Sequence, residues 1–394
     1  MDVFIHIPKT AGSTIRTILS RQYGADGILY FEPGSPGWPA GVTQQQFLDR
    51  EREAREVRLV TGHHPYGVHE RLKTGVRYFS MMRDPVARQI SNYFYAFSYE
   101  HHPLRASIRA GELTPQQFIR QQARLPGTAQ SHLLAGASDT GAGVRAAACH
   151  NLEHAFQAVG IAERFDESLL YIAKVMNWHP PVYMRRNVTR LDDERQAERH
   201  DSEMQVRTIL AHLLADDYAA YHRAQQVMDQ WIAAEGSAFA TAHAAFAEIQ
   251  HDIARQDDDR KYAEYFFQND ARLPALMERY AGSAAFRTMA EYLAAPLALP
   301  RATPNYTGQI DLCRGGAIAG WALDLGSFAP VEVQVLRYGS ELAHIRAERA
   351  RPDVLAAGYP RADVGFRFEH PALQDPSGVE VLFGSGPLRL RWSG

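Results

Sequence analysis

The chain has 394 residues, of which 45% are hydrophobic and 22% are charged, values that are ordinary for a soluble globular protein. This length exceeds what one ordinary hydrophobic core needs and predicts two or three domains. The formal net charge of −3 excludes a global basic field for nucleic acid, so any anion site must be local.

The two cysteines, Cys149 and Cys313, lie far apart in the sequence, which argues against a disulfide framework and favours a reducing compartment. The chain starts on a strand-like segment without a signal-peptide pattern, and it contains no apolar run near 18 residues. We therefore expect a cytoplasmic protein with no membrane span and no nucleic-acid partner.

The first predicted element is a strand–turn–helix unit. The run FIHI predicts a strand, and apolar residues at Ile15, Ile18 and Leu19 predict a helix. Between them lies PKTAGST, residues 8–14, a short hydroxyl-rich turn with one glycine. Such a turn aims backbone N–H groups at one point, where the positive end of the helix dipole favours an anion. The segment therefore predicts a phosphate site.

This turn differs from the common phosphate-binding loop GxxxxGK[ST]. Its lysine, Lys9, precedes Gly12 by three residues instead of following the second glycine. A lysine at the end of the strand would reach over the mouth of the loop toward the distal part of a bound nucleotide. The alternative is a plain strand–turn–helix in which Thr10 or Ser13 only caps the helix.

A second strand–helix junction is predicted in RYFSMMRDPVARQISNYFYAF, residues 77–97. YFSMM predicts a buried strand, and Asp84 followed by Pro85 predicts the cap and first position of a helix. Arg83 would then lie at the carboxyl end of a strand, where open α/β sheets bind ligands. Its guanidinium suits a phosphate that Ser91 could share. The alternative is a local ion pair of Arg83 with Asp84.

The segments LVTGHH, from Leu59, and AFQAVGI, from Ala155, continue the alternation of strands and helices up to about residue 190. This alternation predicts an α/β fold with a parallel sheet covered by helices. From about Asp192 to Leu293 the sequence is almost wholly helical and rich in alanine, and we expect these helices to serve packing.

The sequence changes character after the Pro- and Ala-rich stretch AAPLALPRATPNYTG. Beyond it, segments such as GAIAGWALD, VEVQVLRYG and VGFRFEHP predict short strands in a small all-β module of sandwich type, with Trp321 in its core. The expected domains are an α/β domain over residues 1–225, a helical extension over 226–294, a linker over 295–306 and the all-β domain over 307–394.

PKTAGST after one strand and RDPxxRxxSxYxY after another resemble the two nucleotide-binding motifs of sulfotransferases that use 3′-phosphoadenosine-5′-phosphosulfate (PAPS). TGHHPYG, VGIAERFDESL and MRRNVTR add to the likeness, which covers roughly residues 1–225. The chain is most similar to the carbohydrate O-sulfotransferase branch that contains the heparan-sulfate uronyl and the chondroitin or dermatan sulfotransferases. The C-terminal module resembles β domains appended to bacterial glycan-modifying enzymes, which indicates a bacterial-type protein.

The resemblance implies an enzyme that moves a sulfuryl group from PAPS to an acceptor hydroxyl without a metal, leaving 3′-phosphoadenosine-5′-phosphate (PAP). It also assigns residues to the donor, and Lys9 would in addition stabilise the leaving oxygen. The 5′-phosphosulfate would be held by Lys9, Thr10, Ala11, Gly12, Ser13 and Thr14, and the 3′-phosphate by Arg83 and Ser91.

A histidine that follows glycine between the two motifs is the general base of the uronyl sulfotransferases, and it matches His63. Gly62 would let the backbone turn sharply and bring this imidazole to the pocket. The relatives have His-Gly-His where this chain has Thr61-Gly62-His63, so one family histidine is absent, and His64 is kept as a second candidate for the base. A neutral histidine suits removal of the acceptor's proton.

The expected acceptor is a glycan or a glycan-containing metabolite. Arg185 and Arg186 could receive an acidic glycan, although short arginine runs are usually solvated surface. The aromatic residues from Tyr93 to Tyr99 could stack on sugars or could pack one helix on several sides. The C-terminal module would tether a glycan or serve folding and oligomerisation, so self-association of the chain stays open.

Three other functions fit parts of the pattern. A metal site could form from clustered histidines, but no HExxH or CxxC pattern accompanies them, and a chain with 17 histidines forms clusters by chance. The members of that cluster are His63, His64, His69, His101 and His102. A nucleotide kinase would need the GK[ST] of the common loop, which is missing. The third alternative is a noncatalytic nucleotide- or glycan-binding protein on a degenerate sulfotransferase core.

Overall fold

The computed structural model describes residues 1–35, 38–123, 125, 129–136, 143–184, 193–256, 278–298, 306–325, 330–384 and 389–391. Two site residues expected from the sequence, Arg185 and Arg186, lie outside these ranges, and so does most of the expected linker.

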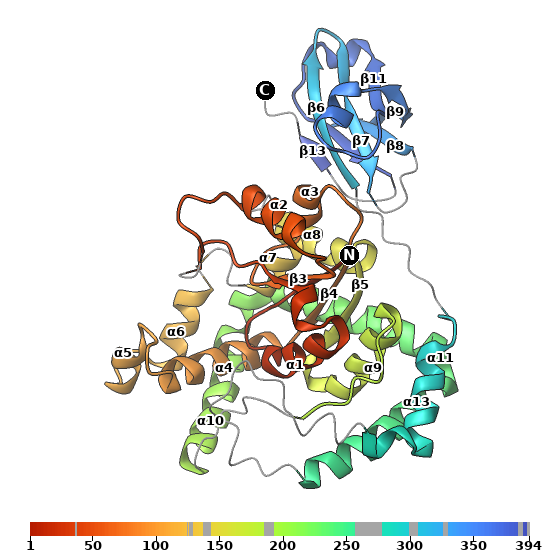
Figure 1. The fold of residues 1–394 in the computed structure, drawn as a ribbon. Coiled ribbons are helices and arrows are strands. Elements are labelled where there is room, and N and C mark those ends of the chain that lie inside the picture. Colours follow the sequence, from red (N-terminus) through yellow and green to blue (C-terminus); the bar gives the residue numbers. More distant parts are fainter. Residues whose placement is uncertain are drawn as a thin grey trace.

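A five-stranded, all-parallel sheet forms the centre of the N-terminal part of the chain (Figure 1). The strand order is β2-β3-β1-β4-β5, so β1 lies in the middle with β3 and β4 as neighbours. Every residue of β1 is buried, as expected of a strand covered on both faces. The predicted α/β fold is confirmed. The strands are β1 (Asp2–Ile5), β2 (Ile28–Tyr30), β3 (Leu59–Gly62), β4 (Arg77–Met82) and β5 (Phe156–Ile161).

Helices connect these strands and pack against the sheet. Both predicted strand–helix junctions are present, as β1–α1 and β4–α4. The Asp84 carboxylate accepts a hydrogen bond from the Ala87 N–H at 2.8 Å and caps α4, and Pro85 takes the first helical position, as predicted. The helices are α1 (Gly12–Tyr23), α2 (Gln44–Ala54), α3 (Val68–Leu72), α4 (Pro85–Ser98), α5 (Arg105–Arg109), α6 (Pro115–Gln122), α7 (Gln130–Ala135), α8 (Gly143–His154) and α9 (Phe165–Met176).

Three further helical segments follow: α10 (Asp193–Leu210), α11 (Ala215–Gln256) and α13 (Ala284–Ala294). α11 changes direction at Gly236, whose φ is 59°. It runs across residue 225, the expected end of the α/β domain, and its buried Met228 and Trp231 belong to the same hydrophobic core as the sheet. Lys174 of α9 is buried and donates hydrogen bonds to the carbonyls of Tyr292 and Ala295 at the end of α13.

The C-terminal module consists of two four-stranded antiparallel sheets, in the orders β10-β11-β7-β6 and β13-β12-β8-β9. Val333, Val381 and Phe366 lie in the core between them, and Trp321 is buried against Tyr359, as predicted. The predicted all-β fold is confirmed. Its elements are β6 (Tyr306–Arg314), β7 (Ala317–Asp324), β8 (Val331–Arg337), β9 (Ser340–Ala347), β10 (Arg349–Ala350), α14 (Pro352–Ala356), β11 (Asp363–Glu369), β12 (Val379–Phe383) and β13 (Arg389–Arg391).

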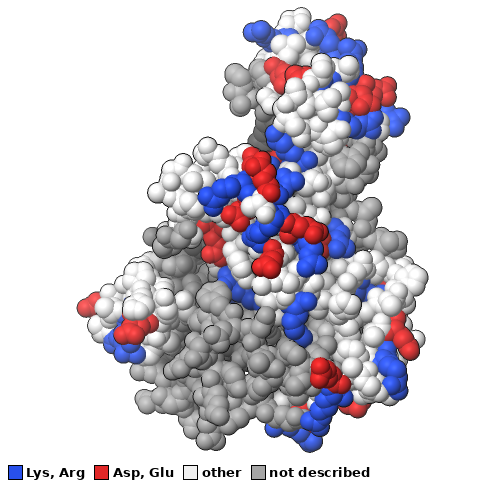
Figure 2. Space-filling model, in the orientation of Figure 1, with Lys and Arg blue, Asp and Glu red and all other residues white. Residues whose placement is uncertain are grey.

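The module touches the α/β part near α3 (Figure 1). Lys73, at the end of α3, donates a hydrogen bond to the Ala357 carbonyl, and its ammonium lies 5.2 Å from the ring centroid of Tyr359. Figure 2 shows acidic and basic side chains intermixed on this face, which agrees with the small net charge. Within the described ranges, no helix combines the length and apolar character needed to cross a bilayer.

Gly62, the last residue of β3, is glycine because of close packing. A β carbon at this position would lie 2.1 Å from the carbonyl oxygen of Phe31, which follows β2. The Phe31 N–H donates to the Thr61 carbonyl at 2.8 Å, which brings the two chain segments together. The sequence interpretation of Gly62 as a sharp turn is therefore replaced by a steric reason within the sheet.

Substituting Gly62→Ala should lower the free energy of unfolding by about 1–3 kcal/mol, because the backbone after β2 must move to admit the methyl group. Urea denaturation of the two proteins measures this change. Gly282→Ala is the matched control, since no atom lies within 4 Å of a β carbon there. A Gly62→Ala midpoint equal to that of Gly282→Ala would contradict the steric reason.

Candidate active site

The site lies at the carboxyl edge of the parallel sheet. Lys9 follows β1, His63 follows β3, Arg83 follows β4 and Glu163 follows β5, so one side chain comes from each of four strands. After β1 the chain builds β2 and β3 on one side of β1, and it then crosses to build β4 and β5 on the other side. The gap between β1 and β4 is therefore the switch point of the sheet. Ligands bind at this place in open α/β sheets.

The loop after β1 has the backbone of an anion cradle. Lys9 and Ala11 both have positive φ, 70° and 66°, a conformation that non-glycine residues adopt at a cost and that concentrates at functional sites. The Thr10 hydroxyl is buried and donates to the Ile7 carbonyl at 2.8 Å, so it stabilises the loop from inside. The 12-residue helix α1 then begins with no side-chain cap and no acidic residue in its first turn. Its positive end is therefore available to an anion.

Gly12, the first residue of α1, allows a histidine to pack against the loop. A β carbon there would lie 1.7 Å from Nε2 of His6, a residue that the sequence interpretation did not single out. The His6 ring is buried and packs against the exposed ring of His63, with centroids 4.4 Å apart and ring planes tilted by 30°. Burial, the neighbouring His63 and the nearby cations keep the pKa of His6 well below its ordinary value. His6 is therefore neutral, and its ring packs between the loop and His63.

The surroundings of Lys9 disfavour the charged form of its side chain. Burial, and then the charges of Arg83 and Arg199, lower the pKa of Lys9 to about 8. Its ammonium lies 4.1 Å from the ring centroid of Tyr95, and its carbonyl accepts a hydrogen bond from Arg83 Nη1 at 3.2 Å. A bound anion would relieve the repulsion among these cations.

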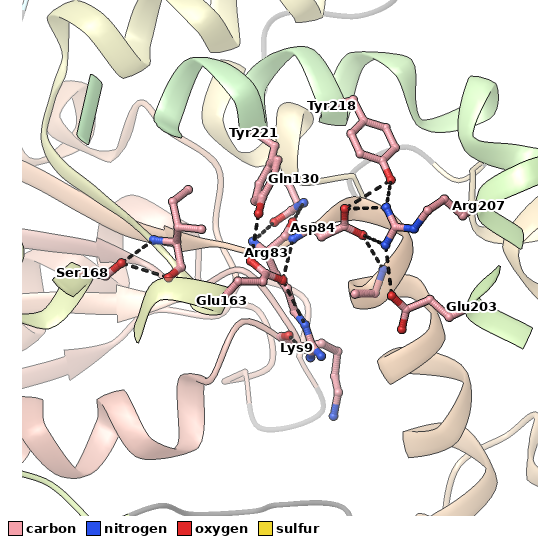
Figure 3. Close-up of polar contacts among 12 residues, drawn as sticks. Lys9, Arg83, Asp84, Gln130, Glu163, Ser168, Glu203, Arg207, Tyr218 and Tyr221 are labelled. Atoms are coloured by element: carbon pink, nitrogen blue, oxygen red, sulfur yellow. Dashed lines mark hydrogen bonds and ion pairs between the residues drawn. The ribbon is translucent and has the colours of Figure 1, made fainter. Parts of the chain in front are cut away.

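Arg83 is clamped through its backbone by the side chain of Gln130 (Figure 3). The Arg83 N–H donates to Gln130 Oε1 at 3.0 Å, and Gln130 Nε2 donates to the Arg83 carbonyl at 2.8 Å. The guanidinium approaches Glu163 at 3.8 Å, which is longer than a hydrogen bond. These two hydrogen bonds with Gln130 therefore fix the backbone of Arg83 and do not involve its guanidinium.

The position of Gln130 is in turn fixed by a buried carboxylate. Asp217 of α11 accepts hydrogen bonds from the Gln130 N–H at 3.2 Å and from the Ser131 N–H and hydroxyl at 2.8 and 2.6 Å. It also lies 3.9 Å from the buried guanidinium of Arg88. Because the Asp217 carboxylate is buried and accepts from both Gln130 and Ser131, it holds the start of α7, and with it Gln130, in place.

Asp84 pairs with a distant arginine. Arg207 of α10 donates to both Asp84 oxygens at 2.9 Å, and the Tyr218 hydroxyl donates to one of them at 3.3 Å. The Asp84 N–H donates to Glu163 at 3.0 Å. The alternative of a local Arg83–Asp84 ion pair is wrong for the described structure, because the carboxylate is already taken by α10 and α11.

The two candidate bases differ sharply in environment. His63 is exposed, and its Nδ1 lies 2.7 Å from the His6 carbonyl oxygen. Since a carbonyl only accepts, Nδ1 carries the hydrogen and the neutral ring keeps its lone pair on Nε2. His64 is buried edge-on against Phe31, and burial lowers its pKa to about 4. Its Nε2 is enclosed by protein.

The remaining expected residues lie on the helices that follow β1 and β4. Ser13 and Thr14 are in the first turn of α1, and Ser91 is a buried residue of α4, two turns from Arg83. Arg199 of α10 was missed in the sequence, although its charge acts on both Lys9 and Arg83. No spacing signals such a residue, because α10 folds back onto α4 from more than 100 positions along the chain.

The histidines of the alternative metal cluster stay apart. His69 is buried and hydrogen-bonds the Tyr78 hydroxyl at 2.8 Å through Nδ1, and burial lowers its pKa to about 4. His101 and His102 follow α4. In the part of the chain that the structure describes, no three His, Cys, Asp or Glu side chains gather as a metal-binding group.

The fold defines an α/β protein, and the cations at its switch point have the charge that an anionic ligand needs. Comparison with protein families narrows this class: the model of the sulfotransferase family matches residues 3–226, more than half of the chain. The chain belongs to the sulfotransferase family, which confirms the family-level prediction. The carbohydrate branch and the bacterial type stay predictions. None of the curated proteins compared with the chain matches it.

Anion binding at this site should weaken as the pH rises above about 8, since Lys9 loses its proton there and a neutral amine no longer attracts an anion. Sulfate, whose charge is constant in this range, is a suitable probe in calorimetry. Its affinity should fall by up to about tenfold per pH unit above that point. Lys9→Arg, which stays charged, should remove the pH dependence; a persisting decline in that variant would assign the titration to another group.

Proposed function

We propose that the protein is a PAPS-dependent O-sulfotransferase that transfers a sulfuryl group to a hydroxyl of a carbohydrate acceptor. The observation that carries this proposal is the hydrogen bond that holds Nδ1 of His63 and leaves Nε2 with its lone pair, at the sheet edge that also carries Lys9 and Arg83. A base and an anion site at one edge are what sulfuryl transfer to a hydroxyl requires.

The residues present fit an anionic donor. The uncapped start of α1 and the left-handed Lys9 and Ala11 give backbone donors at one end, toward the 5′-phosphosulfate. Gly12, Ser13 and Thr14 continue that cradle. Arg83, just before α4, and Ser91, on α4, would hold the 3′-phosphate, for which a guanidinium fork is suited.

The donor supplies an activated sulfur whose bridging oxygen leaves with the nucleotide. Lys9 stabilises the negative charge that develops on that oxygen. Because the pKa of Lys9 is lowered, its N–H groups are more acidic and donate more strongly to that oxygen. His63 takes the acceptor's proton on Nε2 as the new oxygen–sulfur bond forms. No metal is needed for either step.

His63 is the better candidate for the base. A base must reach the acceptor, and the exposed His63 does so whereas His64 is enclosed against Phe31. A group with a pKa of about 4 is also a weak base at neutral pH. His64 remains the second candidate that the experiment below separates.

The setting of the protein is proposed to be the cytoplasm. Cys149 and Cys313 are both free thiols, and Cys313 is buried in the C-terminal module. Chains with unpaired cysteines are typical of reducing compartments. The proposal also keeps the domain boundaries at 225, a position inside α11, and at 294 and 306. It further keeps a glycan-tethering role for the C-terminal module.

The nucleotide preference tests the donor. The protein should bind PAP more tightly than AMP, because only PAP carries the 3′-phosphate for Arg83. Arg83→Ala should remove most of this difference, at a cost of about 1.5–3 kcal/mol for a charged hydrogen bond. Equal calorimetric affinities for PAP and AMP in the unmodified protein would reject PAPS as donor.

Gln130→Ala tests the clamp on Arg83. It should lower PAP affinity toward that of Arg83→Ala while leaving AMP affinity nearly unchanged. Asn151→Ala is the matched control: its buried amide donates to the carbonyls of Leu134 and Ala135 at 2.7 and 3.2 Å, at the other end of α7. A similar loss of PAP affinity in both variants would mean that Gln130 acts only through stability.

His63→Ala should reduce kcat by about 10²–10⁴-fold, the usual contribution of a general base, and should leave PAP affinity intact. Transfer is measured with radiolabelled donor on the best acceptor of an oligosaccharide panel. His64→Ala should instead lower thermal stability, since it empties a buried position, with a small effect on kcat. A nearly active His63→Ala beside an inactive, folded His64→Ala would move the base by one residue.

A further inference from the structure

His6 is a buried imidazole beside the loop after β1. It follows β1 directly, and only 9% of the residue is exposed. The Phe4 ring lies nearly parallel to it, at an angle of 17° with centroids 5.9 Å apart, and the His63 ring packs against it at 4.4 Å. These two neighbours restrict the plane of the His6 ring.

The Nε2 edge of this ring faces the start of α1. The atoms nearest to a β carbon built on Gly12 would be Nε2, Cδ2 and Cε1 of His6, at 1.7, 2.6 and 2.6 Å. Gly12 is the first residue of α1, and this helix begins with no side-chain cap. The ring edge therefore takes the space that a side chain of Gly12 would fill, at the positive end of the helix.

The enclosure of Nδ1 decides which nitrogen of the neutral ring carries the hydrogen. Nδ1 of His6 is enclosed by protein and has no hydrogen-bond partner among the described residues. A neutral imidazole has one N–H donor and one nitrogen with a lone pair. An enclosed N–H without an acceptor is rarer in proteins than an enclosed acceptor that stays unused. Nδ1 therefore keeps the lone pair, and Nε2 carries the hydrogen toward α1.

The surroundings of this N–H group supply donors. α1 begins with backbone N–H groups and has no acidic residue in its first turn. The Ala11 carbonyl points into the helix, where it accepts from the N–H groups of Thr14 and Ile15 at 3.1 and 3.2 Å. Lys9, from the same loop, adds an ammonium whose charge acts on His6. A partner that accepts from all of these donors is an anion.

Packing alone does not account for a histidine at this position. A phenyl ring would fill the same space between Gly12 and His63 without a buried nitrogen. Buried polar atoms in proteins nearly always have a partner, because an unpaired one costs free energy. The imidazole therefore indicates a polar contact that a bound ligand completes.

We infer that His6 binds the nucleotide: its Nε2–H group donates a hydrogen bond to an oxygen of the 5′-phosphate held at the start of α1. The inference rests on the proposed function for the identity of this anion. His6 would then link the nucleotide to the base, since its carbonyl oxygen holds Nδ1 of His63 while its ring faces α1. A neutral donor also adds a contact without adding to the repulsion among the cations of the site.

Calorimetry on the full chain with AMP and with adenosine 3′-monophosphate tests this contact, because only AMP carries a phosphate at the 5′ position. His6→Asn places its amide near the position of Nδ1 and removes the donor at Nε2. It should weaken AMP binding about tenfold, as expected for one hydrogen bond to a charged group, and leave adenosine 3′-monophosphate binding unchanged. His6→Gln places an NH₂ group near the position of Nε2 and should keep most of the AMP affinity.

His69→Asn is the matched control, since it makes the same exchange at another buried histidine, which hydrogen-bonds Tyr78. This variant should lose thermal stability and keep its AMP affinity. A second readout needs no variant. In protein with ¹⁵N-labelled histidine, the His6 signals should show the hydrogen on Nε2, and addition of AMP should shift that N–H proton downfield.

Equal AMP affinities in His6→Asn and the unmodified protein would overturn the inference. Equal losses in His6→Asn and His6→Gln would also overturn it, by leaving the ring a packing role, and so would an equal loss in His69→Asn. The preference for PAP over AMP, measured on the same samples, tests the proposed function separately. Without that preference the proposed function fails, whatever His6→Asn does; with it, normal AMP binding by His6→Asn rejects only the role of His6.

Discussion

Parallel pairing of β1 with β3 on one side and β4 on the other is the constraint on which the site depends. Parallel strands open their carboxyl ends at one edge, so segments separated by many residues must meet there. Ile5 pairs with both Gly62 and Ser80, and each of these strands continues into a residue of the site. Gly62 lets β3 lie close to the segment after β2, because a β carbon there would lie 2.1 Å from the carbonyl oxygen of Phe31.

The backbone of Arg83 is held by a neutral side chain. Gln130 binds the backbone of Arg83 on both sides, and its own orientation is fixed by Asp217 deep in the core. Gln130 is neutral, so it fixes the backbone of Arg83 without adding a negative charge beside the guanidinium; the nearest carboxylate, Glu163, stays at 3.8 Å, beyond hydrogen-bond distance. The same logic explains why Asp84 is occupied by Arg207, which keeps the carboxylate away from the anion site.

Adjacent histidines acquire different chemistry from their surroundings. His63 emerges at the sheet edge with one nitrogen fixed by a backbone carbonyl, while His64 turns into the core beside Phe31. Successive residues of an extended segment point to opposite sides, so one of the pair must face inward. Burial then disfavours the charged form of His64, since an enclosed imidazolium loses its hydration.

Local sequence determined the parallel α/β fold, the all-β module, the cap at Asp84 and the loop after β1, because these depend on periodicity, turn chemistry and neighbouring residues. The family followed from two ordered motifs and is confirmed over residues 3–226. Tertiary structure alone decided that Gln130 binds the backbone of Arg83 and that Arg207 pairs with Asp84. These contacts join elements that are distant in the chain, and their energies arise from packing and burial, which no local pattern encodes.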